Sequence, residues 1–290
     1  TRADERRIVV LSPFFVDARE VTVAEMVQRE TYTPYDPKQD ESPYVGFEAD
    51  TFCTFPQDAA LLTDAIASLP TACISFFGAG SHCAARGATL PTEAQLEYLM
   101  SGLRGARFPW GDDVPDCADA AFARFPSDPN GSQKCAAHAD AGAAESGSGE
   151  LDQLVLPGGT VFDLAGNLRE WTRDRFEPQD SARWTTGVSE DPTCPPEDDA
   201  DRMAVRGGSW AETPLLAHAA RRAHAAPDAQ LGTIGFRCVR DATGTLPTPA
   251  LPALPSWSRV SSFVPRAVSL ASTCSEPLDP ACVQLAVAGK

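Results

Sequence analysis

The chain has 290 residues, of which 43% are hydrophobic and 22% charged, and its formal net charge at pH 7 is −16. This composition is typical of a globular protein and excludes a chain that is disordered throughout. The excess of carboxylates repels phosphate groups, which argues against nucleic acid and anionic membrane surfaces as partners and favours cations such as calcium. No run of apolar residues is long enough for a membrane span.

The first predicted elements are short. Residues 8–16 are rich in β-branched and aromatic side chains, which predicts two strands around a turn. A helix is expected within residues 20–28, because Thr22 and Glu25 have the spacing of a capping box. Residues 31–52 contain several prolines and are expected to form a loop.

The clearest helix in the sequence begins after Thr92, where Gln95 completes a second capping box. Its apolar stripe has helical spacing and consists of Leu96, Leu99, Met100 and Leu103. Residues 58–68 are expected to form a short helix or an insert, and residues 127–150 a long loop rich in Gly, Ala, Ser and Asp. From residue 151 onward, short strand signals are separated by Gly and Pro. No β-α-β alternation appears, which argues against a doubly wound sheet.

The composition changes after residue 240, where a proline recurs every two or three residues. This pattern predicts an extended segment, so the chain divides into a domain over 1–240 and a Pro-rich extension over 241–290. Cys274 and Cys282 close a short loop in the extension and are expected to form a local disulfide.

The nine cysteines indicate disulfides and an oxidising compartment, since no pair has the C-x-x-C spacing of a zinc or thioredoxin motif. The pairs favoured by nearness in sequence are Cys53–Cys73 and Cys117–Cys135. Cys194 is then the odd cysteine. The chain begins at Thr1 without Met or a signal-type apolar region, so a leader is expected to have been removed. These observations predict an extracytoplasmic protein, which is periplasmic, secreted or on the cell surface.

Six segments in a fixed order carry a family resemblance. They are EVT at 20–22, LPTEAQLEY at 90–98, FPWGD at 108–112, DLAGNLREW at 163–171, VRGGSW at 205–210 and IGFRCVR at 234–240. Together they resemble the sulfatase-modifying-factor family, whose best-known member is the formylglycine-generating enzyme. The resemblance implies a single α+β domain with little regular secondary structure, a variant of the C-type-lectin-like fold that calcium helps to stabilise.

The segment at 163–171 is a candidate calcium site. Asp163, Asn167 and Glu170 supply oxygen ligands, and Gly166 allows a tight turn between them. The resemblance implies a structural calcium bound by the side chains of Asp163 and Glu170 and by the carbonyl oxygens of Gly166 and Leu168. The alternative is a polar turn in which Glu170 makes a salt bridge.

The resemblance also implies a disulfide between Cys83 and Cys238. Arg237, at a predicted strand end, is expected to make a buried ion pair or bonds to the backbone rather than to contact a substrate. Gly207 and Gly208 indicate a backbone that turns or closely approaches another segment.

The copper-binding cysteine pair of the family is missing, whereas Ser209 matches the active-site serine that the resemblance implies. The formylglycine-generating enzyme binds copper(I) through two cysteines that follow its G-G-S motif, and thiolates are suitable ligands for this soft ion. Here the segment after Ser209 reads WAETPLLAHAARRAHAAPD and contains no cysteine. Glu212 stands where the first cysteine would be, and the second would fall near residues 216–218. No copper is therefore expected.

Three hypotheses on function follow. The first is a non-catalytic module that binds a protein, peptide or glycan in a groove near Trp210 and Glu212, as a subunit of a larger surface assembly. The second is a metal-dependent oxidoreductase with non-haem iron or copper, in which Glu212, His218 and His224 would hold a harder metal such as iron. Ser209, Glu212 and His218 are its weak catalytic candidates. The third, formylglycine generation, is the least favoured because the cysteine pair is missing.

Overall fold

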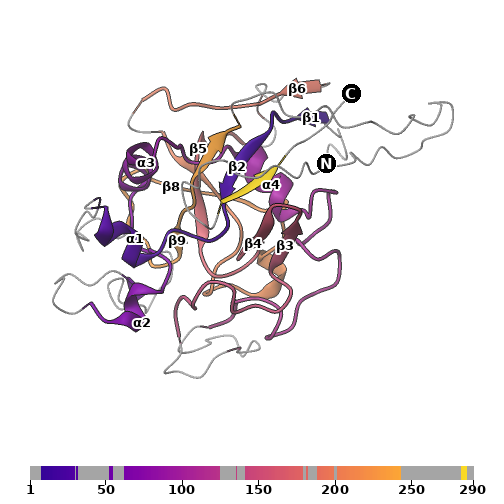
Figure 1. Cartoon of the computed structure of the whole chain (residues 1–290). Helices are drawn as coiled ribbons and strands as arrows, with labels where there is room; N and C mark the ends of the chain where they lie inside the picture. The colour runs from indigo at the N-terminus through magenta and orange to yellow at the C-terminus, as the bar shows by residue number, and fades with distance from the viewer. Residues whose placement is uncertain are drawn as a thin grey trace.

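The structure is a computed structural model and describes residues 8–29, 31, 52–54, 62–124, 135, 141–178, 181, 188–198, 201–242 and, as backbone only, 282–285. Its main sheet has the strand order β8-β7-β5-β9 (Figure 1). The strands are β5 (Arg169–Arg175), β7 (Met203–Arg206), β8 (Arg222–Ala225) and β9 (Ile234–Gly235). β7 is antiparallel to both β5 and β8, whereas β9 is parallel to β5. Three of the six segments that carry the family resemblance therefore meet in this sheet.

Smaller sheets flank the main one. β2 (Phe14–Asp17) lies between β10 (Val239–Asp241) and β11 (Cys282–Leu285), and β3 (Gln153–Leu156) forms a hairpin with β4 (Gly159–Phe162). β1 (Ile8–Val10) pairs in parallel with β6 (Val188–Glu190). The two strands expected over 8–16 are confirmed. The antiparallel pairing of β11 with β2 places residues 282–285 beside a strand from the start of the chain (Figure 1).

The helices are short and begin at capping residues. They are α1 (Val23–Gln28), α2 (Asp64–Ala67), α3 (Phe76–Ala85) and α4 (Glu93–Met100). Both predicted capping boxes are confirmed, and in the second the Thr92 amide donates to Gln95 Oε1 at 2.8 Å. Leu103, expected on the helix, lies beyond its end with φ 62°, because the chain turns after Met100. None of the described helices is long and apolar enough to cross a membrane.

The core lies on both sides of the main sheet, with α1, α2 and α3 on one side and α4 and the β3–β4 hairpin on the other (Figure 1). On the first side, Trp171 of β5 is fully buried and donates its indole N–H to the Ile74 carbonyl at 2.8 Å. On the other side, the buried Leu96, Leu99 and Met100 of α4 pack in one cluster. These residues are the apolar stripe that the sequence predicts.

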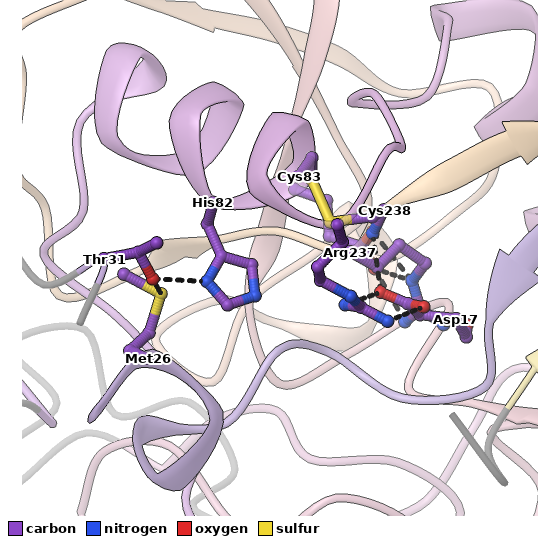
Figure 2. Close-up of a disulfide and its surroundings, with 9 residues drawn as sticks. Asp17, Met26, Thr31, His82, Cys83, Arg237 and Cys238 are labelled. Carbon is purple, nitrogen blue, oxygen red and sulfur yellow. Dashed lines mark hydrogen bonds and ion pairs between the residues drawn. A yellow bond between two sulfur atoms is a disulfide. The ribbon is translucent and has the colours of Figure 1, made fainter. Parts of the chain in front are cut away.

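The described residues contain three disulfides, Cys53–Cys73, Cys83–Cys238 and Cys117–Cys135. These are the pairs expected from nearness in sequence and from the resemblance. Cys83–Cys238 joins α3 to the segment before β10, where the Cys238 amide donates to Asp17 of β2 at 3.0 Å (Figure 2). Cys194 is buried and belongs to no disulfide. Cys274 is outside the described residues, and so is its expected pairing with Cys282.

Candidate functional site

The turn between β4 and β5 contains the predicted calcium ligands. Asp163 and Asn167 have φ values of 55° and 62°, in the left-handed region that Asp and Asn tolerate better than most residues. The Asp163 carboxylate accepts hydrogen bonds from the Ser146 hydroxyl and from the Gly147 amide, the latter at 2.9 Å. Gly166 is packed so closely against Ala121 that a Cβ would lie 2.7 Å from its carbonyl oxygen. This turn accordingly has one tightly defined conformation.

Two buried carboxylates that the sequence analysis missed hold this turn from either side. Asp152 accepts bonds from the successive amides of residues 164, 165 and 166 at 2.7–2.9 Å. Glu20 accepts from the Asn167 side chain at 2.7 Å and from the Leu168 amide at 2.9 Å. Glu20 lies in the EVT segment, one of the six that carry the family resemblance. This was the only feature of the sequence that could have marked Glu20 as part of the site.

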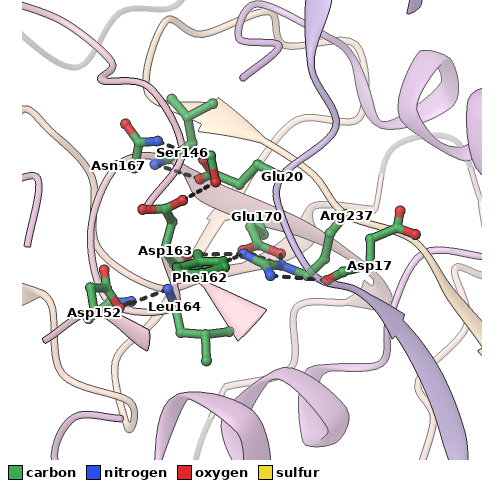
Figure 3. A network of polar contacts seen from close by, with 12 residues as sticks. Asp17, Glu20, Ser146, Asp152, Phe162, Asp163, Leu164, Asn167, Glu170 and Arg237 are labelled. Carbon is green, nitrogen blue, oxygen red and sulfur yellow. Dashed lines mark hydrogen bonds and ion pairs between the residues drawn. The ribbon is translucent and has the colours of Figure 1, made fainter. Parts of the chain in front are cut away.

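Glu170 and Arg237 form an ion pair at the centre of this network (Figure 3). Both side chains are fully buried, with an N···O distance of 2.8 Å. Arg237 also donates to the carbonyl oxygens of Phe162 and Asp163, at 2.8 and 3.0 Å. The buried pair expected for Arg237 is confirmed, and its partner is a predicted calcium ligand.

The network has an excess of negative charge. Burial raises the pKa values of Glu20, Asp152, Asp163 and Glu170, and repulsion by neighbouring carboxylates adds to the effect at Glu20, Asp152 and Glu170. The pKa of Asp152 rises to about 7. Among the described residues, Arg237 is the one fully buried cation bonded to this group (Figure 3). One fully buried guanidinium therefore faces four buried carboxyl groups, and the exposed Arg19 acts on Asp163 as well.

This chemistry fits a hard cation. The predicted donors are all oxygen atoms, as calcium requires, and an added positive charge would offset the repulsion between the carboxylates. Both Glu170 oxygens already accept bonds from Arg237, so a calcium ion here would share Glu170 with the guanidinium. Within the part of the chain that the structure describes, no three His, Cys, Asp or Glu side chains are grouped to hold a metal. The predicted donor set differs from such a group, because it has two carboxylates and two backbone carbonyl oxygens.

The segment after β7 begins with two close contacts. Gly207 has φ 85°, and a Cβ on Gly208 would lie 2.6 Å from the Ala165 carbonyl oxygen and 2.7 Å from Ala217. The Gly208 amide donates to the same carbonyl at 2.9 Å. The turn and close approach expected at these glycines are confirmed, and they place Ser209 beside the turn at 163–168.

Glu212 is held between two guanidinium groups. It is 4% exposed, and it forms ion pairs with Arg169 of β5 and with Arg221. The Arg169 Nε donates to Glu212 Oε2 at 3.0 Å, and the Ser209 hydroxyl donates to the same oxygen at 3.3 Å. Where the resemblance expects a thiolate, this chain therefore has a carboxylate that is paired with two arginines.

The expected binding groove at Trp210 and Glu212 is wrong for these two side chains, because both are buried. Trp210 is 2% exposed, donates its indole N–H to the Gly232 carbonyl at 2.8 Å and packs on Phe52. Any binding surface near this segment must be formed by other side chains.

The structure does not bring the other candidate ligands together. His218 is partly buried, and burial and three neighbouring arginines lower its pKa. His224 is exposed on β8, accepts a bond from Arg202 at 2.9 Å and packs on the Phe176 ring. Among the described residues, Glu212 and the two histidines therefore form no common metal site.

Residues 2–242 match the family model described as the sulfatase-modifying factor enzyme 1-like domain. The inactive Cα-formylglycine-generating enzyme 2 of Mus musculus is 29% identical over 185 residues, which are 60% of this chain and 50% of the relative. The formylglycine-generating enzyme of Streptomyces coelicolor is 29% identical over 191 residues, 60% of this chain and 53% of the relative. The chain thus matches about half the length of these relatives.

Two solved structures have the same fold. PvdO from Pseudomonas aeruginosa has 19% identity and a TM-score of 0.55, over 79% of this chain and 80% of PvdO. Treponema denticola variable protein 1 has 15% identity and a TM-score of 0.53, over 81% of this chain and 86% of that chain. The expected α+β, C-type-lectin-like architecture with little regular secondary structure is confirmed.

Proposed function

Since the chain belongs to the sulfatase-modifying factor family, we propose that it is a non-catalytic member, an extracytoplasmic module that binds a protein, peptide or glycan partner. The observation that carries the proposal is the pairing of Glu212 with Arg169 and Arg221 at the position where the resemblance expects a copper-binding cysteine. No cysteine follows Ser209 before Cys238, and Cys238 is in a disulfide.

The chemistry of this segment supports the proposal. Copper(I) prefers thiolates, and the Glu212 oxygens are already bonded to two guanidinium groups. Cys194 is buried next to Asp174, whose carboxylate accepts from the Cys194 amide at 2.7 Å, and it follows a different strand from Ser209. The inactive mammalian relative is a precedent for a family member without turnover.

The proposed location outside the cytoplasm rests on the disulfides. Three disulfides in one domain are typical of proteins that fold in an oxidising compartment, because cytosolic thiols are kept reduced. A role as a subunit of a larger surface assembly is part of the same proposal.

We further propose that calcium stabilises the domain through the carboxylates of Asp163 and Glu170 and the carbonyl oxygens of Gly166 and Leu168. The support is the excess negative charge around this turn and the all-oxygen donor set. When bound, calcium would supply positive charge to the buried carboxylates. The residues of the chain hold the turn in place through Asp152 and Glu20.

The stabilisation by calcium is expected to increase with pH. Burial raises the pKa of Asp152 from its ordinary value of 3.8 to about 7. The stability that this group contributes is therefore complete below pH 3.8 and is lost as pH rises through about 7, when the buried group must ionise. Calcium favours the ionised forms, so it should offset this loss.

Urea unfolding at pH 5 and pH 8, with calcium or with EDTA, measures this effect. We expect the difference between the calcium and EDTA curves to be larger at pH 8, with magnesium at the same concentration as the control for a general ionic effect. Equal stability in calcium and EDTA at both pH values would show that the turn binds no calcium.

The proposal predicts no turnover of a cysteine substrate. The full chain is incubated with copper(I), oxygen, a reductant and a cysteine peptide on which the Streptomyces coelicolor enzyme, as positive control, forms formylglycine. We expect the peptide mass to stay that of the thiol, and oxygen consumption to equal that of the protein-free sample. Formylglycine in the peptide would contradict the proposal. Protein-dependent oxygen consumption with added iron would favour the metal-dependent oxidoreductase instead.

A further inference from the structure

A patch of positive charge lies near the segment that would carry the catalytic residues. We call it the cationic surface, and it comprises Arg104, Arg107, Leu215, Leu216, His218 and Arg221. Arg104 and Arg107 are exposed, and His218 and Arg221 are partly exposed. In a chain with a net charge of −16, such a patch is unusual and calls for a reason.

Backbone contacts join the two segments that form the cationic surface. The Ala219 amide donates to the Arg107 carbonyl at 2.7 Å, and the Arg221 guanidinium lies 3.3 Å from the Leu216 carbonyl oxygen. Trp110 packs against the buried cluster of Phe108, Ala165 and Ala217, to which both segments contribute. The two segments therefore lie side by side.

The positive charge of this surface is incompletely compensated. Arg221 of this surface pairs with Glu212, a carboxylate that also pairs with Arg169. Among the described residues, the Arg107 guanidinium has no hydrogen-bond or ion-pair partner, and Arg104 donates to the Trp110 carbonyl at 2.9 Å rather than to a carboxylate. The charge is thus available to a ligand.

Two further observations define the sign of the local field. The charged groups that act on His218 are all arginines, namely Arg221, Arg107 and Arg206. Glu212 pairs with Arg221, and in the turn after Trp110 the Asp112 carboxylate accepts from the Arg107 amide at 2.9 Å.

Apolar side chains stand beside these cations. Leu215 and Leu216 lie on the 3₁₀ helix Pro214–Leu216 and are 68% and 40% exposed. Large exposed apolar side chains within a charged patch are typical of sites that bind a protein. The Trp110 ring is stacked on Phe108 with centroids 4.8 Å apart, so one of its faces is not free to stack on a sugar.

We propose that the cationic surface binds an acidic peptide segment of a partner protein, in which an apolar side chain adjoins the carboxylates. The carboxylates would meet Arg104, Arg107 and Arg221, and the apolar side chain would cover Leu215 and Leu216. This inference rests on the proposed function as a binding module and names the class of its partner. Guanidinium groups favour carboxylates through charge-assisted, often bidentate hydrogen bonds.

The test starts with selection of a random peptide library on the immobilised full chain. We expect the selected sequences to be enriched in Asp and Glu next to apolar residues. One selected peptide, labelled with fluorescein, is then titrated by anisotropy against the wild type and Arg107→Glu. We expect binding to weaken about tenfold or more in the variant, and also when the salt concentration is raised.

Matched variants test whether a loss of binding is specific to this surface or follows from any change in charge or hydrophobicity. Leu215→Ser is compared with Val155→Ser, since Val155 is also exposed, at 74%, on β3. Arg107→Glu is compared with Arg29→Glu, an exposed arginine that ends α1. We expect the control variants to bind within about twofold of the wild type, and thermal melts to show that all four variants are folded.

Several outcomes would overturn the inference. They are a selection enriched in Lys and Arg, a selection without charge enrichment, and equal binding by the wild type and Arg107→Glu. A different result would assign the surface to a glycan and leave the binding function intact. In that case the chain would bind a sulfated oligosaccharide but no acidic peptide, and Arg107→Glu would weaken the binding. Formylglycine production in the turnover assay would instead contradict the proposed function itself.

Discussion

Replacement of Glu170 by glutamine is expected to destabilise the chain by about 3–5 kcal/mol, because it leaves the fully buried Arg237 guanidinium without its anionic partner. The loss should be larger than for most substitutions, since the same guanidinium holds the carbonyl oxygens of Phe162 and Asp163. Urea unfolding in EDTA measures this loss without a contribution from calcium.

Glu97→Gln is the matched control for this prediction. Glu97 also pairs with a buried arginine, Arg206, but its side chain is 53% exposed and Arg206 retains Glu93 as a second partner. We expect a loss below about 1 kcal/mol for this variant. Similar losses for both variants would show that the Glu170–Arg237 pair does not hold the centre of the domain.

Removal of the Cys83–Cys238 disulfide is the second change with a large expected effect. The two cysteines are 155 residues apart, and the loop-entropy relation gives about 5 kcal/mol for a loop of this length. The bond also joins α3 to the segment before β10 within the core, where both cysteines are buried. The double variant Cys83→Ala/Cys238→Ala should therefore unfold at a much lower urea concentration.

Cys117→Ala/Cys135→Ala provides the comparison. These cysteines are 18 residues apart, for which the same relation gives about 3 kcal/mol. We expect the loss of unfolding free energy to be larger when the disulfide that closes the longer loop, Cys83–Cys238, is removed. A larger loss for Cys117–Cys135 would mean that local packing, rather than chain entropy, determines what each disulfide contributes.

Local features of the fold were predictable from the sequence. The capping boxes at Thr22–Glu25 and Thr92–Gln95 depend on residues three apart, and both form as expected. The apolar stripe of α4 likewise depends on helical spacing, but its last member, Leu103, lies beyond the end of the helix. The spacing of apolar residues does not indicate where the helix ends, so the turn after Met100 could not be predicted from it.

Long-range features were harder to predict. Glu20 bonds to residues 147 and 148 positions away, and Asp152 holds three amides of a turn that begins eleven residues later. No spacing rule links such positions, so both buried carboxylates were missed. The expected exposure of Trp210 and Glu212 was wrong for the same reason, since Glu212 bonds to Arg169 of β5 and Trp210 packs on Phe52.

Metal content of the full chain tests the central claim most directly, which is that this module carries a structural cation and no redox centre. The protein is incubated with calcium, copper(I) and iron(II), passed through gel filtration, and analysed by plasma mass spectrometry. The account predicts about one calcium per chain, with copper and iron at the level of the buffer. Stoichiometric copper or iron would contradict it and would direct attention to the residues around Glu212 and His218.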